Sequence, residues 1–123
     1  MYRILVLLVV VVLIYTTTGV TQAEAPLRTL NQYTVSELVH HFASQYSVSA
    51  HRMLATMNCE SSMNTKAVGD HNTSFGIAQI HLPAHPDITK EQAENAIFAS
   101  EFMAKEFAQH NQDAWSCYRE LYE

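Results

Sequence analysis

Glu60 is the residue of this sequence whose type and position best fit acid–base chemistry. An apolar stripe at helical spacing precedes it, formed by Ala50, Met53, Leu54 and Met57. The same period brings Glu60 onto the apolar side of a predicted helix. A carboxyl group at the end of an apolar face is held partly out of water, and desolvation disfavours its charged form. The pattern therefore predicts a side chain that can act as a general acid.

A polar segment follows this carboxyl group. Residues 62–76 are rich in Asn, Thr, Ser, Asp and Gly and lack helical periodicity, which predicts a loop. The next segment, 77–82, is apolar and fits either a strand or one buried helical turn. Besides Glu60, the candidate site residues of this region are Ser61, Asn64, Ala67, Gly69, Ser74, Gly76, Gln79 and Ile80.

In this order the residues resemble the motif of the lytic transglycosylases of the soluble-transglycosylase type, in the lysozyme-like superfamily. In that family a helix ends in Glu-Ser, a loop with Asn and Ala follows, and a Ser-x-Gly-x-x-Gln segment packs beside the glutamate. The chain reads C-E-S-S-M-N-T-K-A-V-G-D over 59–70 and S-F-G-I-A-Q-I over 74–80. The resemblance covers residues 33–122, and it implies a lysozyme-like domain that acts on peptidoglycan.

The resemblance assigns the catalytic role to Glu60. Glycosidic cleavage needs a neutral carboxylic acid that protonates the leaving oxygen. The family cleaves the β-1,4 bond between N-acetylmuramic acid and N-acetylglucosamine. The substrate's own 6-hydroxyl then attacks and leaves a 1,6-anhydro end, so that one carboxylate serves as acid and then as base. The resemblance therefore implies an enzyme, a peptidoglycan lytic transglycosylase without a cofactor.

Three polar residues of the motif are expected to bind the substrate. Ser74 and Gln79 match positions that line the sugar site of the family, where each side chain can bond a hydroxyl or N-acetyl group. Their structural alternatives are a turn residue for Ser74 and a solvated side chain for Gln79. Ser61 is as well suited to bracing the loop as to touching substrate.

The chain departs from the family downstream. It lacks the A-Y-N-x-G segment whose tyrosine sits near the catalytic glutamate, and Trp115-Ser116-Cys117-Tyr118 stands in the corresponding part of the chain. Tyr118 is a candidate for the tyrosine's role, because a Cys59–Cys117 bond would bring it close to Glu60. Tyr122 is the other candidate, and a core position is the alternative for both.

The presence of Asp70 leaves open whether the enzyme is a transglycosylase or a hydrolase. It is the one acidic residue between Glu60 and Gln79, and it fits the second carboxylate of an inverting, lysozyme-type hydrolase. A Gly-Asp pair is also good turn chemistry. A further alternative is a non-catalytic peptidoglycan-binding or assembly protein that kept the fold.

Helices must position these residues. A capping box at Thr34–Glu37 predicts a helix that ends near residues 45–47, and a second helix begins after Ser49. Another capping box, Thr89–Gln92, opens a helix that continues to Phe107, and Asp113 is a suitable N-cap for the last helix. The expected fold class is mostly α, with a short loop or strand region after the glutamate.

The first 23 residues have the pattern of a signal peptide. One positive charge precedes the apolar run 4–15, and a polar stretch with small residues ends at Ala23. We expect cleavage there, which leaves residues 24–123 as the exported domain, in the periplasm or outside the cell. An uncleaved anchor is the alternative. After cleavage, no stable membrane insertion is expected.

Charge and cysteines restrict the possible partners. The chain has 12 acidic and 7 basic residues without a basic cluster, which argues against nucleic-acid binding. Peptidoglycan glycan strands are the expected partner of a monomer, and family analogy adds a secretion or conjugation apparatus as a candidate. Cys59 and Cys117, in an oxidising compartment, predict a disulfide; a metal or catalytic thiol pair would be expected to show C-x-x-C spacing.

The histidines do not predict a metal site. The chain has 7 of them, but His40 and His41 are adjacent on a helix and point apart. His81 and His85 have suitable spacing, yet Pro83 between them argues against a regular helix. No H-E-x-x-H or comparable motif occurs.

Overall fold

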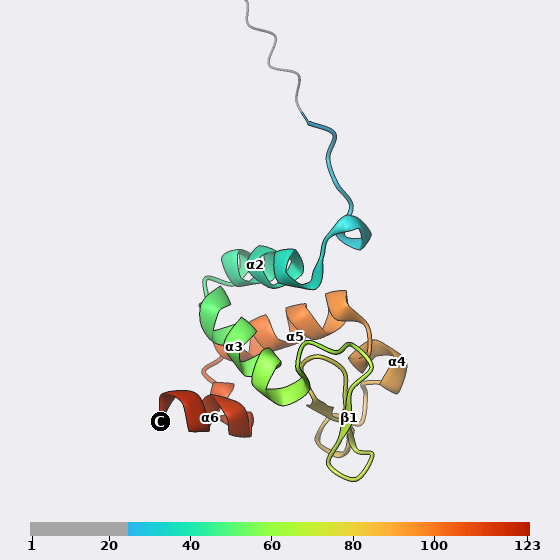
Figure 1. The fold of residues 1–123 in the computed structure, drawn as a ribbon, viewed down its shortest axis with the longest axis vertical. Coiled ribbons are helices and arrows are strands. Elements are labelled where there is room, and N and C mark those ends of the chain that lie inside the picture. Colours follow the sequence, from blue (N-terminus) through green and yellow to red (C-terminus); the bar gives the residue numbers. More distant parts are fainter. Residues whose placement is uncertain (1–24) are drawn as a thin grey trace, which may run out of the picture.

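The computed structural model describes residues 25–123, so the predicted signal peptide at 1–23 lies outside the described residues. The fold is mostly helical with one small sheet, as the sequence predicts (Figure 1). Its elements in chain order are the 3₁₀ turn η1 (Leu30–Gln32), α2 (Val35–Gln45), α3 (Ala50–Ser61), β1 (Val68–Gly69), β2 (Ser74–Phe75), β3 (Ile80–His81), η2 (Leu82–Ala84), α4 (Lys90–Ala93), α5 (Ala96–Ala108), η3 (Gln112–Ala114) and α6 (Ser116–Tyr122).

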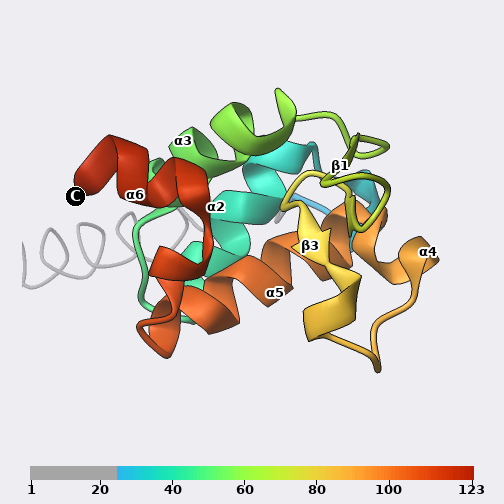
Figure 2. The same ribbon diagram turned by 90° about the horizontal axis from the view of Figure 1, so that it is seen from below.

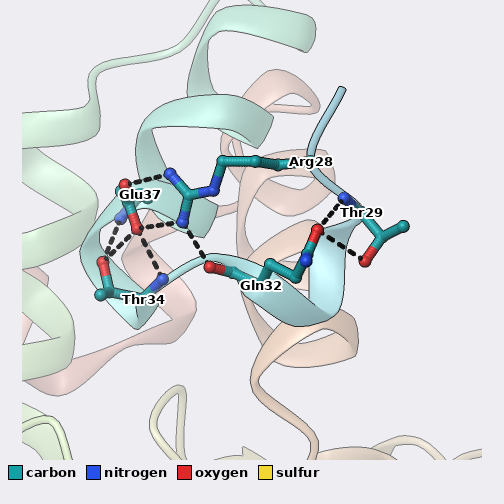
Figure 3. A network of polar contacts seen from close by, with 5 residues as sticks. All are labelled: Arg28, Thr29, Gln32, Thr34 and Glu37. Atoms are coloured by element: carbon teal, nitrogen blue, oxygen red, sulfur yellow. Dashed lines mark hydrogen bonds and ion pairs between the residues drawn. The ribbon is translucent and has the colours of Figure 1, made fainter. Parts of the chain in front are cut away.

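Helix α2 begins at the predicted capping box. The Thr34 hydroxyl accepts a hydrogen bond from the Glu37 amide, and the Glu37 carboxylate accepts one from the Thr34 amide at 2.7 Å. Arg28 extends this network with a bond to Glu37 Oε1 at 2.8 Å (Figure 3). These contacts fix where the helix begins, and therefore which of its faces meets the core.

The core forms where α2 packs on α5 and on α3. Helix α2 contributes its predicted face, which buries Leu38, Val39, Phe42 and Ala43. Met53 and Met57 of α3 and Met103 of α5 are fully buried between the helices. Because α3 is anchored in this way, its last turn, which carries Glu60, has a fixed position at the edge of the core.

The polar segment after α3 is mostly loop, as expected, but it contains two short strands that form a small sheet with β3. The order is β1-β2-β3, both pairs are antiparallel, and Ser74 stands opposite Gly69 on one side and His81 on the other. The apolar segment 77–82 contains one of these strands, and a 3₁₀ turn follows it. Two-residue strands show no alternation of polar and apolar side chains, so the sequence did not indicate β1 and β2 and left 77–82 open between a strand and a helical turn.

Two helix boundaries differ from the prediction. The helix expected from Thr89 onward is divided, because the Asn95 side chain accepts bonds from the Ile97 and Phe98 amides and caps a new helix, α5. Asp113 does not cap the last helix but lies inside η3, so the N-cap of α6 is Trp115. In both views, the sheet and α4 lie toward one end of α5, and α6 lies at the other end (Figures 1 and 2).

None of the helices in residues 25–123 is long and apolar enough to cross a membrane.

Candidate active site

A cleft of about 380 Å³ lies between the end of α3, the sheet, α5 and α6. Five of the candidate site residues from the sequence line it together: Glu60, Asp70, Ser74, Gln79 and Ile80. The others that line it are His81, Ala84, His85, Phe102, Glu106, Ala114, Trp115, Ser116 and Arg119. Its volume falls within the range of small-molecule sites.

Glu60 is the next-to-last residue of α3 and is half-buried. Its Oε1 accepts a hydrogen bond from the Cys117 amide at 3.1 Å, and the Ser116 hydroxyl lies 3.5 Å from the same oxygen. Among residues 25–123, nothing bonds to Oε2. The carboxyl group is therefore oriented through one oxygen, and the other stays available for a ligand.

The predicted disulfide is present and explains this contact. Cys59 and Cys117 are joined with their Cα atoms 5.9 Å apart, so the end of α3 is tied to the start of α6. Cys59 precedes Glu60 directly, and the Cys117 amide is the donor to Oε1. The cross-link thus positions the carboxyl group as well as joining two helices.

Ser61 lies outside the cleft lining. Its hydroxyl lies 2.9 Å from the Met57 carbonyl and 2.8 Å from the Ile77 carbonyl, both of which only accept. The Ser61 hydroxyl therefore joins the end of α3 to the turn before β3, so this residue braces the loop.

Asp70, Ser74 and His81 form a polar network on the sheet side of the cleft. The hydroxyl of fully buried Ser74 donates to Asp70 Oδ2. His81 Nδ1 lies 3.2 Å from this hydroxyl and 3.3 Å from that of Thr73. Asp70, His71 and Asn72 have positive φ angles, and such a run makes the sharp turn that returns the chain into β2.

Gln79 is held in a strained conformation. Its φ is 47°, a left-handed value that is uncommon for residues other than glycine. Its Nε2 donates to the Gly76 carbonyl at 2.9 Å and to the Ala67 carbonyl at 3.2 Å. Such strain costs about 1–3 kcal/mol and clusters at functional sites. The amide donors are used by the fold, which leaves the Gln79 Oε1 atom as the polar group for a ligand.

Tyr118 does not line the cleft, although Cys117 beside it contacts Glu60. It is buried, its hydroxyl accepts a bond from Arg52 Nη1 at 3.0 Å, and its ring packs edge-on against Phe107. Successive residues of a helix point roughly 100° apart, so the side that presents Cys117 to Glu60 turns Tyr118 away. Tyr122 is also absent from the lining.

The aromatic wall of the cleft, formed by Phe102, Trp115 and His85, was not evident from the sequence. Trp115 donates from its indole nitrogen to the Ala78 carbonyl at 2.7 Å, which joins η3 to the turn before β3. Phe102 packs edge-on against both Trp115 and His85, at centroid distances of 6.3 and 5.0 Å. Phe102 and Glu106 are four residues apart on α5, so the helical period could have placed them on one face. Nothing in the sequence indicated that this face meets Glu60.

The site contains acid–base groups but no metal cluster. Its titratable lining residues are Glu60, Asp70, His81, His85, Glu106 and Arg119. Within residues 25–123, no three His, Cys, Asp or Glu side chains are grouped as a metal ion would require. The chemistry that this lining itself can supply is proton transfer and hydrogen bonding.

Comparison of the chain with protein-family models, with curated proteins and with solved structures gave no match. A proposal of function therefore depends on the motif and on the geometry of the cleft.

Proposed function

We propose that the protein is a peptidoglycan lytic transglycosylase that cleaves the β-1,4 bond between N-acetylmuramic acid and N-acetylglucosamine. One observation carries the proposal. Glu60, the carboxyl that the sequence indicates as general acid, lines a single cleft with Gln79 and with Ser74, whose buried hydroxyl is bonded to Asp70 rather than free for the sugar. Glu60 lies on a different element from Ser74 and Gln79, 14 residues before Ser74, so folding has to bring it to them.

The arrangement supports one carboxyl acting as acid and then as base. The Cys117 amide bonds to Oε1, so a proton on Oε2 can be directed at the substrate. That proton passes to the glycosidic oxygen, the bond to the anomeric carbon breaks, and the leaving sugar keeps a 4-hydroxyl. The substrate's 6-hydroxyl oxygen bonds to the anomeric carbon and returns its proton to Glu60. No water is consumed, and the carboxyl group is regenerated.

The other walls suit a sugar chain. Phe102 and His85 offer apolar ring surface, and hexose rings have apolar faces. Gln79 lines the cleft, and its carbonyl oxygen has no hydrogen-bond partner within residues 25–123. The substrate lies outside the cytoplasm, and the disulfide is compatible with an exported protein.

A second candidate is a lysozyme-type hydrolase. The observation in its favour is that Asp70 lines the same cleft as Glu60. A second carboxylate facing the anomeric carbon could activate a water molecule, which would give a reducing end in place of the anhydro end. In the structure, Asp70 Oδ2 is bonded by Ser74, so one carboxylate oxygen is already used.

Digestion of purified cell-wall sacculi followed by mass spectrometry tests both candidates. We expect anhydro-muropeptides, each one water lighter than the hydrolytic product. Glu60→Gln should reduce their release by at least about 100-fold, the usual contribution of a general acid. Glu120→Gln, an exposed position on α6, is the matched control and should release them at the wild-type rate.

Other outcomes would contradict the proposal. Reducing-end products that disappear in Asp70→Asn would identify the hydrolase. Sacculus binding by both wild type and Glu60→Gln, without any soluble product, would indicate a glycan-binding protein and overturn both enzymatic candidates.

A further inference from the structure

The hydroxyl group of Thr73 determines which nitrogen of His81 carries a proton. Thr73 Oγ1 lies 2.6 Å from the Asp70 carbonyl oxygen, which can only accept, so the single hydroxyl proton points there. The same oxygen lies 3.3 Å from His81 Nδ1. Because the hydroxyl has no second proton to give, it faces the imidazole as an acceptor, and Nδ1 must be the donor.

Ser74 leads to the same assignment independently. Its hydroxyl donates to Asp70 Oδ2 and lies 3.2 Å from His81 Nδ1. With its proton directed at the carboxylate, Ser74 can also only accept from the ring. Two hydroxyl groups whose protons are already used therefore select the same tautomer, with the proton on Nδ1.

The opposite ring nitrogen is not used by the fold. His81 is exposed and lines the cleft, and no group in residues 25–123 bonds to its Nε2. In a neutral imidazole with a proton on Nδ1, Nε2 carries a lone pair. The network thus presents an acceptor atom in the same cleft as Glu60.

We infer that His81 is a substrate-binding residue, held as the Nδ1–H tautomer by Thr73 and Ser74, whose bare Nε2 accepts a hydrogen bond from the ligand of the cleft. The ligand chemistry is an O–H or N–H donor. The identification of this ligand as a glycan, which would donate from a sugar hydroxyl or an acetamido N–H, rests on the proposed function. The assignment of the His81 tautomer does not depend on that function.

The tautomer is tested by NMR without any activity measurement. Long-range ¹H–¹⁵N spectra of ¹⁵N-labelled protein, recorded where His81 is neutral, distinguish a protonated from a bare ring nitrogen. We expect protonated Nδ1 and bare Nε2, the reverse of the form that free histidine favours in water. Nε2–H in the wild type would overturn the inference.

Removal of the two acceptors provides the matched comparison. Thr73→Val removes one hydroxyl with little change of shape at a partly exposed position, and Ser74→Ala removes the other. The double variant should shift His81 toward the Nε2–H form. Thr73→Val alone should shift it partly, which keeps the test valid if loss of the buried Ser74 hydroxyl prevents folding. An unchanged tautomer in the folded double variant would contradict the assignment.

The acceptor role is tested with N-acetylglucosamine tetramer and the Glu60→Gln background, which prevents turnover. Saturation should move the ¹⁵N resonance of Nε2 because it accepts a bond. His81→Asn keeps an N–H near the Nδ1 position and loses the acceptor, so we expect about tenfold weaker binding. His81→Gln carries an amide oxygen near the Nε2 position and should recover part of this loss.

A second ligand separates the two donor types. Cellotetraose has hydroxyls in place of the acetamido groups, so a similar Nε2 shift would identify a hydroxyl donor, and a shift with the N-acetylated tetramer alone would identify the acetamido N–H. An unmoved Nε2 resonance at saturation would overturn the role of His81 while the proposed function stands. A tetramer that does not bind would overturn the glycan assignment and count against the proposed function, with the tautomer decided by its own spectrum.

Discussion

At the residue scale, the chemistry of the cleft depends on where single protons are placed. Glu60 has one oxygen bonded by the Cys117 amide and one without a partner in the described chain. His81 lines the same cleft and is similar, with one ring nitrogen facing two hydroxyls and the other without a partner in the described chain. Glu60 was evident in the sequence from its position after an apolar stripe. His81 was not, because its pairing with Ser74 depends on strand register.

The direction of the Tyr118 side chain could not be inferred from the position of its neighbour Cys117. The expected disulfide does bring Cys117 to Glu60, but the helix turns the next side chain toward Arg52. We predict that Tyr118→Phe lowers the free energy of unfolding by about 1 kcal/mol, because Arg52 loses its acceptor. Release of muropeptides should be unchanged.

Denaturant unfolding and sacculus digestion measure the two effects of Tyr118→Phe separately. Tyr122→Phe is the matched control, because Arg52 contacts the face of the Tyr122 ring, which phenylalanine keeps. A large loss of activity in Tyr118→Phe without loss of stability would instead support the catalytic role expected from the sequence.

At the element scale, helices with side-chain caps could be predicted well, whereas of the sheet the sequence suggested only a strand within 77–82. Thr34 and Ser49 cap α2 and α3 where the sequence indicated. The helix breaks before α5 because Asn95 caps a new helix. In the sequence, an asparagine that caps a helix looks the same as one inside a helix, so the break could not be predicted. The turns that join the strands contain residues with left-handed backbone conformations, such as Asp70 and Gln79. Their residue types allow a turn but do not require this conformation, so the sequence did not predict it.

The turn between β2 and β3 requires glycine at position 76. Its φ is +78°, and a Cβ there would lie 1.9 Å from the Ala93 carbonyl oxygen, a backbone atom that cannot move aside cheaply. We predict that Gly76→Ala costs about 3 kcal/mol or more of unfolding free energy, from the clash and the backbone strain together. Thermal or denaturant unfolding measures this.

Gly69→Ala is the informative comparison. Its Cβ would lie 2.3 Å from Gln79 Oε1, the end of a flexible side chain, and its φ is not in the left-handed region. It should therefore cost less than Gly76→Ala, about 1–2 kcal/mol from disturbing the two hydrogen bonds of the Gln79 amide, and muropeptide release should fall because that amide is displaced. Equal destabilisation by the two variants would show that the turn does not require glycine at position 76.

The start of α2 predicts a pH dependence. The hydrogen bond from Arg28, with those from the Thr34 amide and hydroxyl, lowers the pKa of Glu37 from 4.5 to about 2. A folded-state pKa below the unfolded value means that this stabilisation is present above about pH 4.5 and is lost as the pH falls toward 2. Glu37→Gln keeps the capping geometry that Gln32 and Gln92 show in their own capping boxes, and it removes the charge.

We therefore expect the wild type to melt above Glu37→Gln at pH 6, and the difference to shrink steadily below pH 4.5 and vanish only below about pH 2. Melting curves across this range measure it. Combining Glu37→Gln with Arg28→Gln isolates the ion pair, since Arg28 is the largest cause of the shift. A difference that persists unchanged at pH 2 would show that the charge of Glu37 does not contribute.

At the scale of the whole molecule, the site is assembled from distant parts of the chain. Glu60 is in the last turn of α3, Ser74 and His81 lie in the sheet, Phe102 is on α5, and Trp115 precedes α6. The sequence identified the first two segments of this set through a motif. It could not identify the aromatic wall, because an apolar helix position has the same pattern whether it faces the core or a cleft.

The disulfide connects these parts, since the chain between its cysteines includes the sheet, α4 and α5. The link spans a sequence separation of 58 residues. Closing a loop of that length adds about 4 kcal/mol in the chain-entropy model. For a domain of this size we expect the Cys59→Ser, Cys117→Ser double variant to melt about 15–30 °C lower than the oxidised wild type.

Activity should fall further than stability explains. At a temperature where the double variant is still folded, the end of α3 is no longer tied to α6, so the Cys117 amide is held less firmly at Glu60 Oε1. Sacculus digestion at that temperature, with circular dichroism to verify folding, separates the two effects. Full activity in the folded, bridge-free protein would mean that packing alone orients Glu60; an unchanged melting temperature would mean that the bridge does not contribute to the fold either.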